Sequence, residues 1–376
     1  MAGFYFHVPY CRQVCYYCDF HFRVALNDKS EMLTAMQKEM QFRKDYLPFP
    51  LMHTLYFGGG TPSVLSVADL SMLLDAFHRH YSLSPDAEIT LEANPDDLTD
   101  EYLSGLHDLG FNRLSIGIQS FDDEILRRMN RRHTAQEAIH AVRKAQNRGF
   151  ENINIDLMYG IPAMPVSQWE QHLKTALSLD IPHLSAYHLT IEPRTVFGKR
   201  KSRGESFSVP EEESVEQFDI LSETCGNAGY EHYEISNFAR PGHYSRHNTA
   251  YWQQIPYTGI GPSAHSYDGT SRQWNVSNNT QYIELLLNGR EKWYEREIPT
   301  VSESYNDYVL TSLRTMWGVD TGFIRKKFGD DTAFSFVRKA DSYLRQGYIN
   351  EHAAVYTLSH KGKLIADRIA SDLFIV

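Results

Sequence analysis

Three cysteines near the start of the chain have the spacing to hold one metal centre. Cys11, Cys15 and Cys18 form the pattern C-x3-C-x2-C, directly after an apolar, aromatic run. A four-iron cubane or a structural zinc site is normally held by four protein ligands. Three thiolates on a four-iron cluster therefore leave one iron open, and an open iron can bind a substrate or a cofactor.

Other arrangements of these cysteines compete with an iron–sulfur cluster. Close clustering after a strand disfavours three buried, inert thiols. A disulfide would use two of the three cysteines, leave an odd one and suit a secreted chain. A zinc site would need a fourth ligand, which His7 or His21 could supply from nearby in the sequence. Zinc is therefore the main alternative.

The bulk composition describes a globular chain from a reducing compartment. The 376 residues are 42% hydrophobic, enough for one large domain and a small one. Only four cysteines occur, and the fourth, Cys225, is expected to be a small buried apolar residue. This usage predicts a cytoplasmic location, as does the lack of a secretory leader or a membrane-spanning apolar run. The net charge of −10 disfavours a general nucleic-acid partner.

The first half of the chain alternates apolar strands with helical segments. The expected strands cover 2–8, 53–59, 88–92, 113–119, 152–158 and 183–192. The expected helices cover 29–46, 66–80, a segment starting near Thr99, 122–129, 134–148 and 167–179. Such alternation is typical of βαβ units and a parallel sheet. It predicts an α/β fold whose core is a partial (βα)6 TIM-type barrel, open on one side.

Polar residues recur where these strands end. The glycines of Gly58–Pro62, and then Glu92, Gln119 and Asp156, end successive strands. In parallel α/β folds, the carboxyl ends of the strands gather the chemistry. Each residue alone has a plainer explanation, such as a turn for the glycines or a helix-capping acid for Glu92. For Arg131, within a basic run, a surface salt bridge is the plainer explanation on sequence alone, and a ligand carboxylate is the alternative.

The second half is less regular. Residues 198–210 are basic and rich in Gly and Ser, which predicts a solvated loop, and an acidic helix starts after Pro210. Residues 230–280 read as aromatic loops. Residues 300–376 predict a mainly helical, winged-helix-like domain, for which the acidity of the chain favours a packing or lid role. The predicted division is 1–229 for the barrel, 230–299 for a connecting region and 300–376 for the last domain.

The motifs together resemble the radical S-adenosylmethionine (SAM) superfamily, and within it the oxygen-independent coproporphyrinogen III oxidases and their relatives. The resemblance spans nearly the whole chain. The matching stretches are YFHVPYCRQVCYYCDF, GGGTPS, EANPDDL, RLSIGIQSF, NRRH, NIDLMYGIP, HLSAYHLTIE, YEISNFARPG, HNTAYW and GIGPSAHSY. Within that family the chain is most similar to the HemW branch, described as haem chaperones.

The resemblance implies three cofactors or ligands and their residues. Cys11, Cys15 and Cys18 match the ligands of a [4Fe–4S] cluster, whose open iron holds SAM. The positions that match SAM contacts are Tyr5, Gly59, Gly60, Thr61, Glu92, Gln119, Arg131 and Asp156. His247, in HNTAYW, matches the histidine implicated in haem transfer, although a histidine beside aromatics is more often a packed residue. His243 and His265 are close in sequence and could be the haem ligand instead.

The resemblance implies that the chain binds haem and delivers it to haem-dependent, respiratory proteins. It also implies peripheral association with a membrane and is compatible with a homodimer. The alternative is the oxidase itself, which decarboxylates coproporphyrinogen III with a radical made from SAM. Phe20 occupies the position of a further cysteine in the oxidase, and the short stretch before Cys11 leaves no room for the oxidase's extension, so that activity is disfavoured. A third reading is a radical SAM enzyme with another substrate, in which HNTAYW would be structural.

Overall fold

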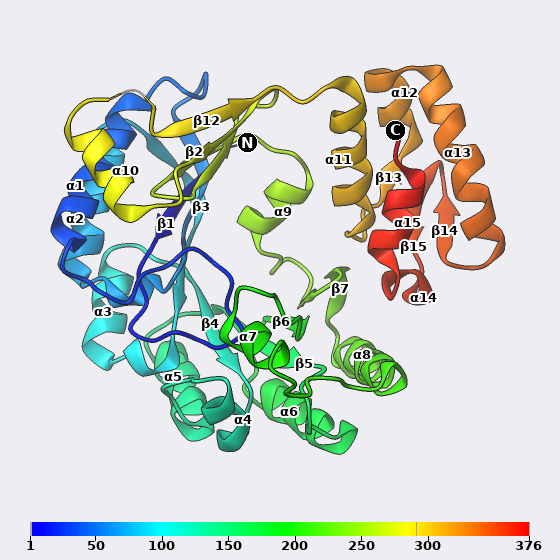
Figure 1. Cartoon of the computed structure of the whole chain (residues 1–376), viewed down its shortest axis with the longest axis horizontal. Helices are drawn as coiled ribbons and strands as arrows, with labels where there is room; N and C mark the ends of the chain where they lie inside the picture. Colours follow the sequence, from blue (N-terminus) through cyan, green and yellow to red (C-terminus); the bar gives the residue numbers. More distant parts are fainter. Residues whose placement is uncertain (1, 291, 376) are drawn as a thin grey trace.

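The computed structural model describes residues 2–290 and 292–375. Within these ranges the first six strands form a parallel sheet in sequence order, as predicted. They are β1 (Gly3–Val8), β2 (Leu51–Gly59), β3 (Ser82–Ala93), β4 (Arg113–Gln119), β5 (Asn152–Tyr159) and β6 (His183–His188). The sheet is strongly curved, so that these strands form the wall of a partial barrel (Figure 1).

Six helices connect these strands and cover the outside of the curve (Figure 1). They are α1 (Lys29–Phe42), α2 (Val67–His78), α3 (Asp100–Asp108), α4 (Asp123–Arg128), α5 (Ala135–Asn147) and α6 (Val166–Ser178). Side-chain caps fix several of their starts, as at Thr99, whose hydroxyl accepts from the amide of Tyr102 at 3.2 Å. The helices pack on the apolar side chains that every second residue of a strand points outward, such as the fully buried Leu55 and Phe57 of β2.

Two predictions for the end of the barrel need correction. The sixth strand was expected to reach Glu192, but β6 ends at His188, where the chain turns toward Pro193. The predicted loop 198–210 begins inside a helix, α7 (Val196–Lys201). The helix forms because Thr195 caps it, accepting from the amide of Gly198 at 3.0 Å, and because Phe197 is buried. The predicted acidic helix follows as α8 (Glu211–Asn227).

The prediction of aromatic loops over 230–280 was also wrong. Short strands there extend the sheet at both edges: β7 (Glu231–Glu234), β8 (Asn237–Ala239), β9 (Tyr257–Ile260), β10 (His265–Tyr267) and β11 (Arg272–Asn275), joined later by β12 (Tyr294–Glu297). β9 pairs parallel with β1, and β8 pairs antiparallel with β6. Strands of three or four residues carry too little alternation to be recognised in a sequence.

Helix α9 (Arg246–Trp252) lies on the concave side of the sheet, whereas the connecting helices lie outside it (Figure 1). Helix α10 (Asn279–Leu287) packs against α1 on the outside. The parts of the chain that precede and follow α9 thus add strands to opposite edges of the sheet. This places α9 across the open side of the barrel.

The last part of the chain has its own hydrophobic cluster, around Phe336 and Ile369. Its helices are α11 (Val301–Leu313), α12 (Thr321–Phe328), α13 (Asp330–Arg345), α14 (His360–Lys363) and α15 (Ala366–Leu373). β13 (Val319–Asp320), β14 (Ile349–His352) and β15 (Val355–Leu358) form a small antiparallel sheet. This matches the mainly helical, winged-helix-like part that was predicted, while the division at 229 and 299 stays a prediction. No helix within the described residues combines the length and the apolar character needed to cross a bilayer.

Candidate functional site

The inner face of the barrel carries polar side chains at matching positions of neighbouring strands. Strand register places Tyr5 beside Tyr56, and Glu92 beside Ser115. Asp156 of β5 lies beside Ser185 of β6. These residues alternate with outward apolar ones along strands that are buried on both sides. A polar residue at every second position of an apolar strand is the sequence signal that would have identified the whole inner face, and not only the strand ends.

The loop of three cysteines is held against the end of α4 by backbone hydrogen bonds. The amide of Tyr16 donates to the carbonyl of Met129 at 3.1 Å, and the amide of Cys11 donates to the carbonyl of Arg23 at 3.0 Å. Cys11 is buried, while Cys15 and Cys18 are half-buried. The loop is therefore ordered by partners on both sides, with its thiols at the carboxyl end of the barrel.

Two polar side chains contact the thiols directly. The Thr61 hydroxyl donates to Cys11 Sγ at 3.3 Å, and Arg131 Nη1 donates to Cys15 Sγ at 3.2 Å. The Arg131 guanidinium also donates to Asn94 Oδ1 at 2.7 Å and to the carbonyl of Gly117 at 2.5 Å. The surface salt bridge expected of Arg131 on sequence alone is thus wrong. Asn94 and the Gly117 carbonyl together orient this guanidinium.

The surroundings of the thiols suit negatively charged sulfur that is bound to metal. Burial raises the pKa of Cys11 to about 12, against the Thr61 hydrogen bond, and raises the pKa of Cys18 to about 11. Metal binding must then displace the protons. The positive charge of Arg131 and the hydroxyl of Thr61 would stabilise the resulting thiolates. The donor set therefore fits an iron–sulfur cluster held by three cysteines.

Among the described residues, no three His, Cys, Asp or Glu side chains converge on one point as ligands of a single metal ion do. This absence concerns single ions only. The thiolates of a cubane each ligate a different iron, and so they stand further apart than the ligands of one ion.

The glycine turn after β2 brings backbone close to the cysteine loop. Gly59 has φ +108°, and a Cβ there would lie 2.6 Å from the His7 ring. A Cβ on Gly60 would lie 2.6 Å from the carbonyl oxygen of Tyr10. Both positions therefore require glycine. The turn therefore packs its backbone directly against β1 and the residues that lead into the cysteine loop.

Glu92 is tied to this glycine turn and caps no helix. Its carboxylate accepts from the Tyr56 hydroxyl at 2.7 Å and from the amide of Gly59 at 3.2 Å. Burial raises the pKa of Glu92 to about 7, so this carboxyl group can gain or lose a proton near neutral pH. Tyr56 was not among the residues predicted for the site.

Gln119 and Asp156 complete the polar rim. Gln119 has φ +71° at an irregularity of β4, which ends the strand and turns the residue out of register. Asp156 accepts from Asn154 Nδ2 at 2.8 Å, and burial raises its pKa. The predicted positions Tyr5, Gly59, Gly60, Thr61, Glu92, Gln119, Arg131 and Asp156 thus all lie on the inner face or at the carboxyl ends of the strands.

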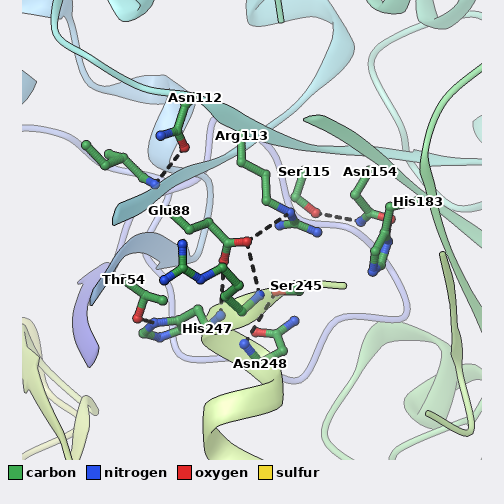
Figure 2. Close-up of polar contacts among 12 residues, drawn as sticks. Thr54, Glu88, Asn112, Arg113, Ser115, Asn154, His183, Ser245, His247 and Asn248 are labelled. Carbon is green, nitrogen blue, oxygen red and sulfur yellow. Dashed lines mark hydrogen bonds and ion pairs between the residues drawn. The ribbon is translucent and has the colours of Figure 1, made fainter. Parts of the chain in front are cut away.

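His247 lies deeper in the barrel than the cysteine loop, and its ring stacks on those of Tyr56 and Tyr5, with centroids 4.9 and 6.1 Å apart. Its Nδ1 bonds Thr54 Oγ1 at 2.8 Å (Figure 2). Its Nε2 bonds the Tyr251 hydroxyl at 2.7 Å. Thr54 and Gly59 are separated along β2 by roughly 16 Å, at about 3.3 Å per residue. The ring is buried, with 1% of the residue exposed, and burial lowers its pKa to about 3. His247 is therefore a neutral imidazole with both nitrogens engaged.

A buried carboxylate holds α9 in this place. Glu88 of β3 accepts from the amides of Arg246 and His247, each at 3.0 Å, at the start of the helix (Figure 2). Its other neighbour is the buried guanidinium of Arg113, at 3.9 Å. Neither residue can be singled out from local patterns, because Arg113 meets Glu88, and Glu88 meets α9, only in the folded barrel.

Comparison with known proteins places this architecture in a family. The chain is 36% identical over 372 residues to "Heme chaperone HemW" of Bacillus subtilis (strain 168), covering 98% of each sequence. It is 31% identical over 381 residues to the protein of that name from Escherichia coli (strain K12), covering 99% of this chain and 97% of the relative. The chain belongs to the HemW family. A model of the radical SAM superfamily also matches residues 5–176 of this HemW-family chain.

The fold of this HemW-family protein is shared with a solved enzyme structure. The coproporphyrinogen III oxidase HemN of Escherichia coli, described as a radical SAM enzyme, superposes with a TM-score of 0.85. The match covers 99% of this chain and 90% of HemN, at 24% sequence identity. At that identity the similarity concerns the fold alone. The predicted radical SAM fold is thereby confirmed.

Proposed function

We propose that this chain binds a [4Fe–4S] cluster, SAM and haem, and delivers haem to haem-dependent proteins. The observation that carries the proposal is the full-length similarity to proteins named heme chaperones. The donor set at the cysteine loop supports the cluster, which would be held by Cys11, Cys15 and Cys18. A bound cluster would supply an electron to SAM.

The side chains around the loop would orient SAM at the open iron. Arg131 and Thr61 contact the thiols, and the glycine turn lies against the same loop. Glu92, with its hydrogen bonds from Tyr56 and Gly59, would accept from an amine or ribose hydroxyl of SAM. Tyr5, Gln119 and Asp156 would complete the contacts along the inner face.

His247 has a role in haem transfer under this proposal. For His247 to ligate iron, it would have to give up its bond to Thr54 or to the Tyr251 hydroxyl. Such a change would leave the Thr54 or the Tyr251 hydroxyl without its imidazole partner. The His247→Ala variant should therefore transfer haem poorly to an acceptor protein while keeping its cluster, and unchanged transfer would remove the role given to His247.

The receiving proteins are proposed to be respiratory haem proteins, reached in the cytoplasm or at its membrane surface. The acidic charge leaves no expected role for nucleic acid. The competing function is the oxidase activity, since the oxidase HemN has the same fold. Against that activity stands Phe20, which replaces the oxidase's further cysteine.

One experiment separates chaperone from oxidase. The protein is reconstituted anaerobically with iron and sulfide, and then given either haem or coproporphyrinogen III, with SAM and a reductant. The chaperone proposal expects stoichiometric haem binding and no protoporphyrinogen. The Cys15→Ala variant is the control, because it should lose the cluster. Conversion of coproporphyrinogen by the wild type, lost in this variant, would establish the oxidase instead.

A further inference from the structure

A cavity of about 500 Å³ lies between the added strands β9–β11 and the C-terminal helices α11 and α12. A second cavity, of about 430 Å³, adjoins it and shares Gln254, Tyr267, Gly269 and Lys327. We refer to the two together as the groove. Its size falls in the range of pockets for small molecules and cofactors, about 300–1,000 Å³. Among the described residues, the lining of the groove includes none from the cysteine loop, and Tyr251 of α9 connects it to the interior of the barrel.

Strand register gives the groove a flat wall of aromatic and basic side chains. In the β10–β11 hairpin, His265 lies opposite Trp274, and Tyr267 lies opposite Arg272. Tyr267 also lies opposite Tyr257 of β9. Directly opposed residues in antiparallel strands share a face, and alternate residues along a strand share it too. All five side chains therefore stand on one face of the three strands.

The opposite face of the hairpin is fixed to the body of the protein. Ser266 and Gln273 are buried there. Arg43, the residue directly after α1, donates to Gln273 Oε1 at 2.7 Å, and it is paired with Glu39 at 2.7 Å. The ordered rear face makes the flat wall a rigid surface on which a planar ligand can stack.

His265 has an available imidazole. The residue is exposed. Among the described residues, neither of its ring nitrogens has a hydrogen-bond partner, unlike those of His247. Partial burial in the groove and the nearby charge of Arg272 lower the pKa of His265, so the ring is neutral at pH 7. Neutral imidazole is the form that ligates a metal.

Two cations line the same groove. Arg272 is ion-paired with Asp307 of α11, and the guanidinium has five N–H donors, so it can serve a second carboxylate as well. Lys327 of α12 has its Nζ 5.4 Å from the ring centres of Phe323 and Phe328. The groove thus joins a metal ligand, flat aromatic faces and two positive charges.

We propose that the groove is the resting site of haem, with His265 as iron ligand, Tyr257 and Tyr267 against the macrocycle, and Arg272 and Lys327 at the propionates. Imidazole is a common protein ligand of haem iron. This inference rests on the proposed function, because it presupposes that the chain binds haem.

The groove is linked to His247 through one residue. Tyr251 lines the groove, and its hydroxyl bonds His247 Nε2 at 2.7 Å. Its ring also packs edge-on against Tyr257, with centroids 4.5 Å apart. Haem that contacts Tyr257 and Tyr251 would therefore press on the partner of His247, which gives α9 a route by which to sense an occupied groove.

The test is a titration of ferric haem into the reconstituted, full-length protein. Absorption difference spectra and electron paramagnetic resonance report the iron ligand. His265→Ala should lose the histidine-ligated signature of the wild type and bind haem at least about tenfold more weakly, with added imidazole restoring the spectrum. His352→Ala is the matched control, because His352 is also exposed but lies on β14, outside the groove.

A second measurement covers the charges. Lys327→Ala should weaken binding of haem but leave binding of haem dimethyl ester unchanged, since the ester has no carboxylates. A His265→Ala protein with the affinity and spectra of the wild type would overturn the inference and leave the proposed function intact. A wild-type protein that binds no haem would overturn both.

Discussion

His247 and His265 both lie on the segment between β8 and β11, but one is buried and hydrogen-bonded while the other is exposed. His247 is buried inside the barrel, and each of its nitrogens has a hydroxyl partner. His265 stands on an exposed strand face beside a groove, without such partners among the described residues. His247 matches a family motif, yet His265 has the free ligand atoms.

Whether a histidine is available to bind iron thus depends on the side chains that surround it in the fold and not on its neighbours in sequence. A buried imidazole with two hydrogen bonds is a structural element whose loss should be felt in stability. An exposed imidazole contributes little to stability and is free to bind metal. This contrast can therefore be tested by measuring the free energy of unfolding as well as haem binding. The largest change in that free energy is expected at Glu88, which holds the helix that carries His247.

The largest effect is expected for Glu88→Ala. This change leaves Arg113 buried without its carboxylate neighbour and removes the acceptor of two amides at the start of α9. Removing one partner of a buried ion pair typically lowers the free energy of unfolding by about 3–5 kcal/mol. Urea unfolding followed by circular dichroism measures this loss.

Asp86→Ala is the control for Glu88→Ala. Asp86 pairs with Arg246, at the same end of α9, but it is exposed to solvent. Its loss should barely change the unfolding midpoint. Equal losses for the two variants would mean that α9 is not held from inside the barrel.

The second test compares the two histidines directly. His247→Ala removes the partner of two buried hydroxyl groups, Thr54 and Tyr251, and should lower the free energy of unfolding by about 3 kcal/mol. His265→Ala should change it by less than about 0.5 kcal/mol, as for exposed positions in general. The same unfolding experiment measures both. A large loss for His265→Ala would show that its ring has a structural role after all.

The smallest effect concerns pH: the loss in free energy of unfolding caused by His247→Ala should depend on it. The pKa of His247 is lowered from 6.5 to about 3 by burial, so below pH 6.5 the unfolded chain takes up a proton that the folded chain does not. Wild-type stability from this group is complete above pH 6.5 and is lost as the pH falls toward 3. The variant has no such loss.

The deficit of His247→Ala against the wild type should therefore shrink by about 2 kcal/mol between neutral pH and about pH 5. Paired unfolding curves at several pH values measure it, and the other buried histidines cancel because both proteins contain them. A constant deficit would mean that the imidazole is protonated in the folded barrel.

Much of the barrel follows from sequence because its signals are local. Apolar periodicity predicts strand β2 and helix α5, and the Thr134–Glu137 capping box also marks the start of α5. The cysteine spacing likewise predicts the loop, and the glycine turn follows a recognisable strand. By contrast, β9 pairs with β1, although almost the whole barrel lies between them in the sequence. No local pattern identifies a strand of four residues as the partner of β1.

The sequence alone determined the order of the barrel strands, the three-cysteine loop and the family, since each depends on residue types at short spacing. The burial of Arg131 against Cys15, the entry of α9 into the barrel, and the contrast between the enclosed His247 and the exposed His265 depend on the folded structure. The physical reason is that burial and hydrogen bonding are made by segments far apart in the chain. Glu88 and His247 meet only after β3 and α9 have been brought together by the folded sheet.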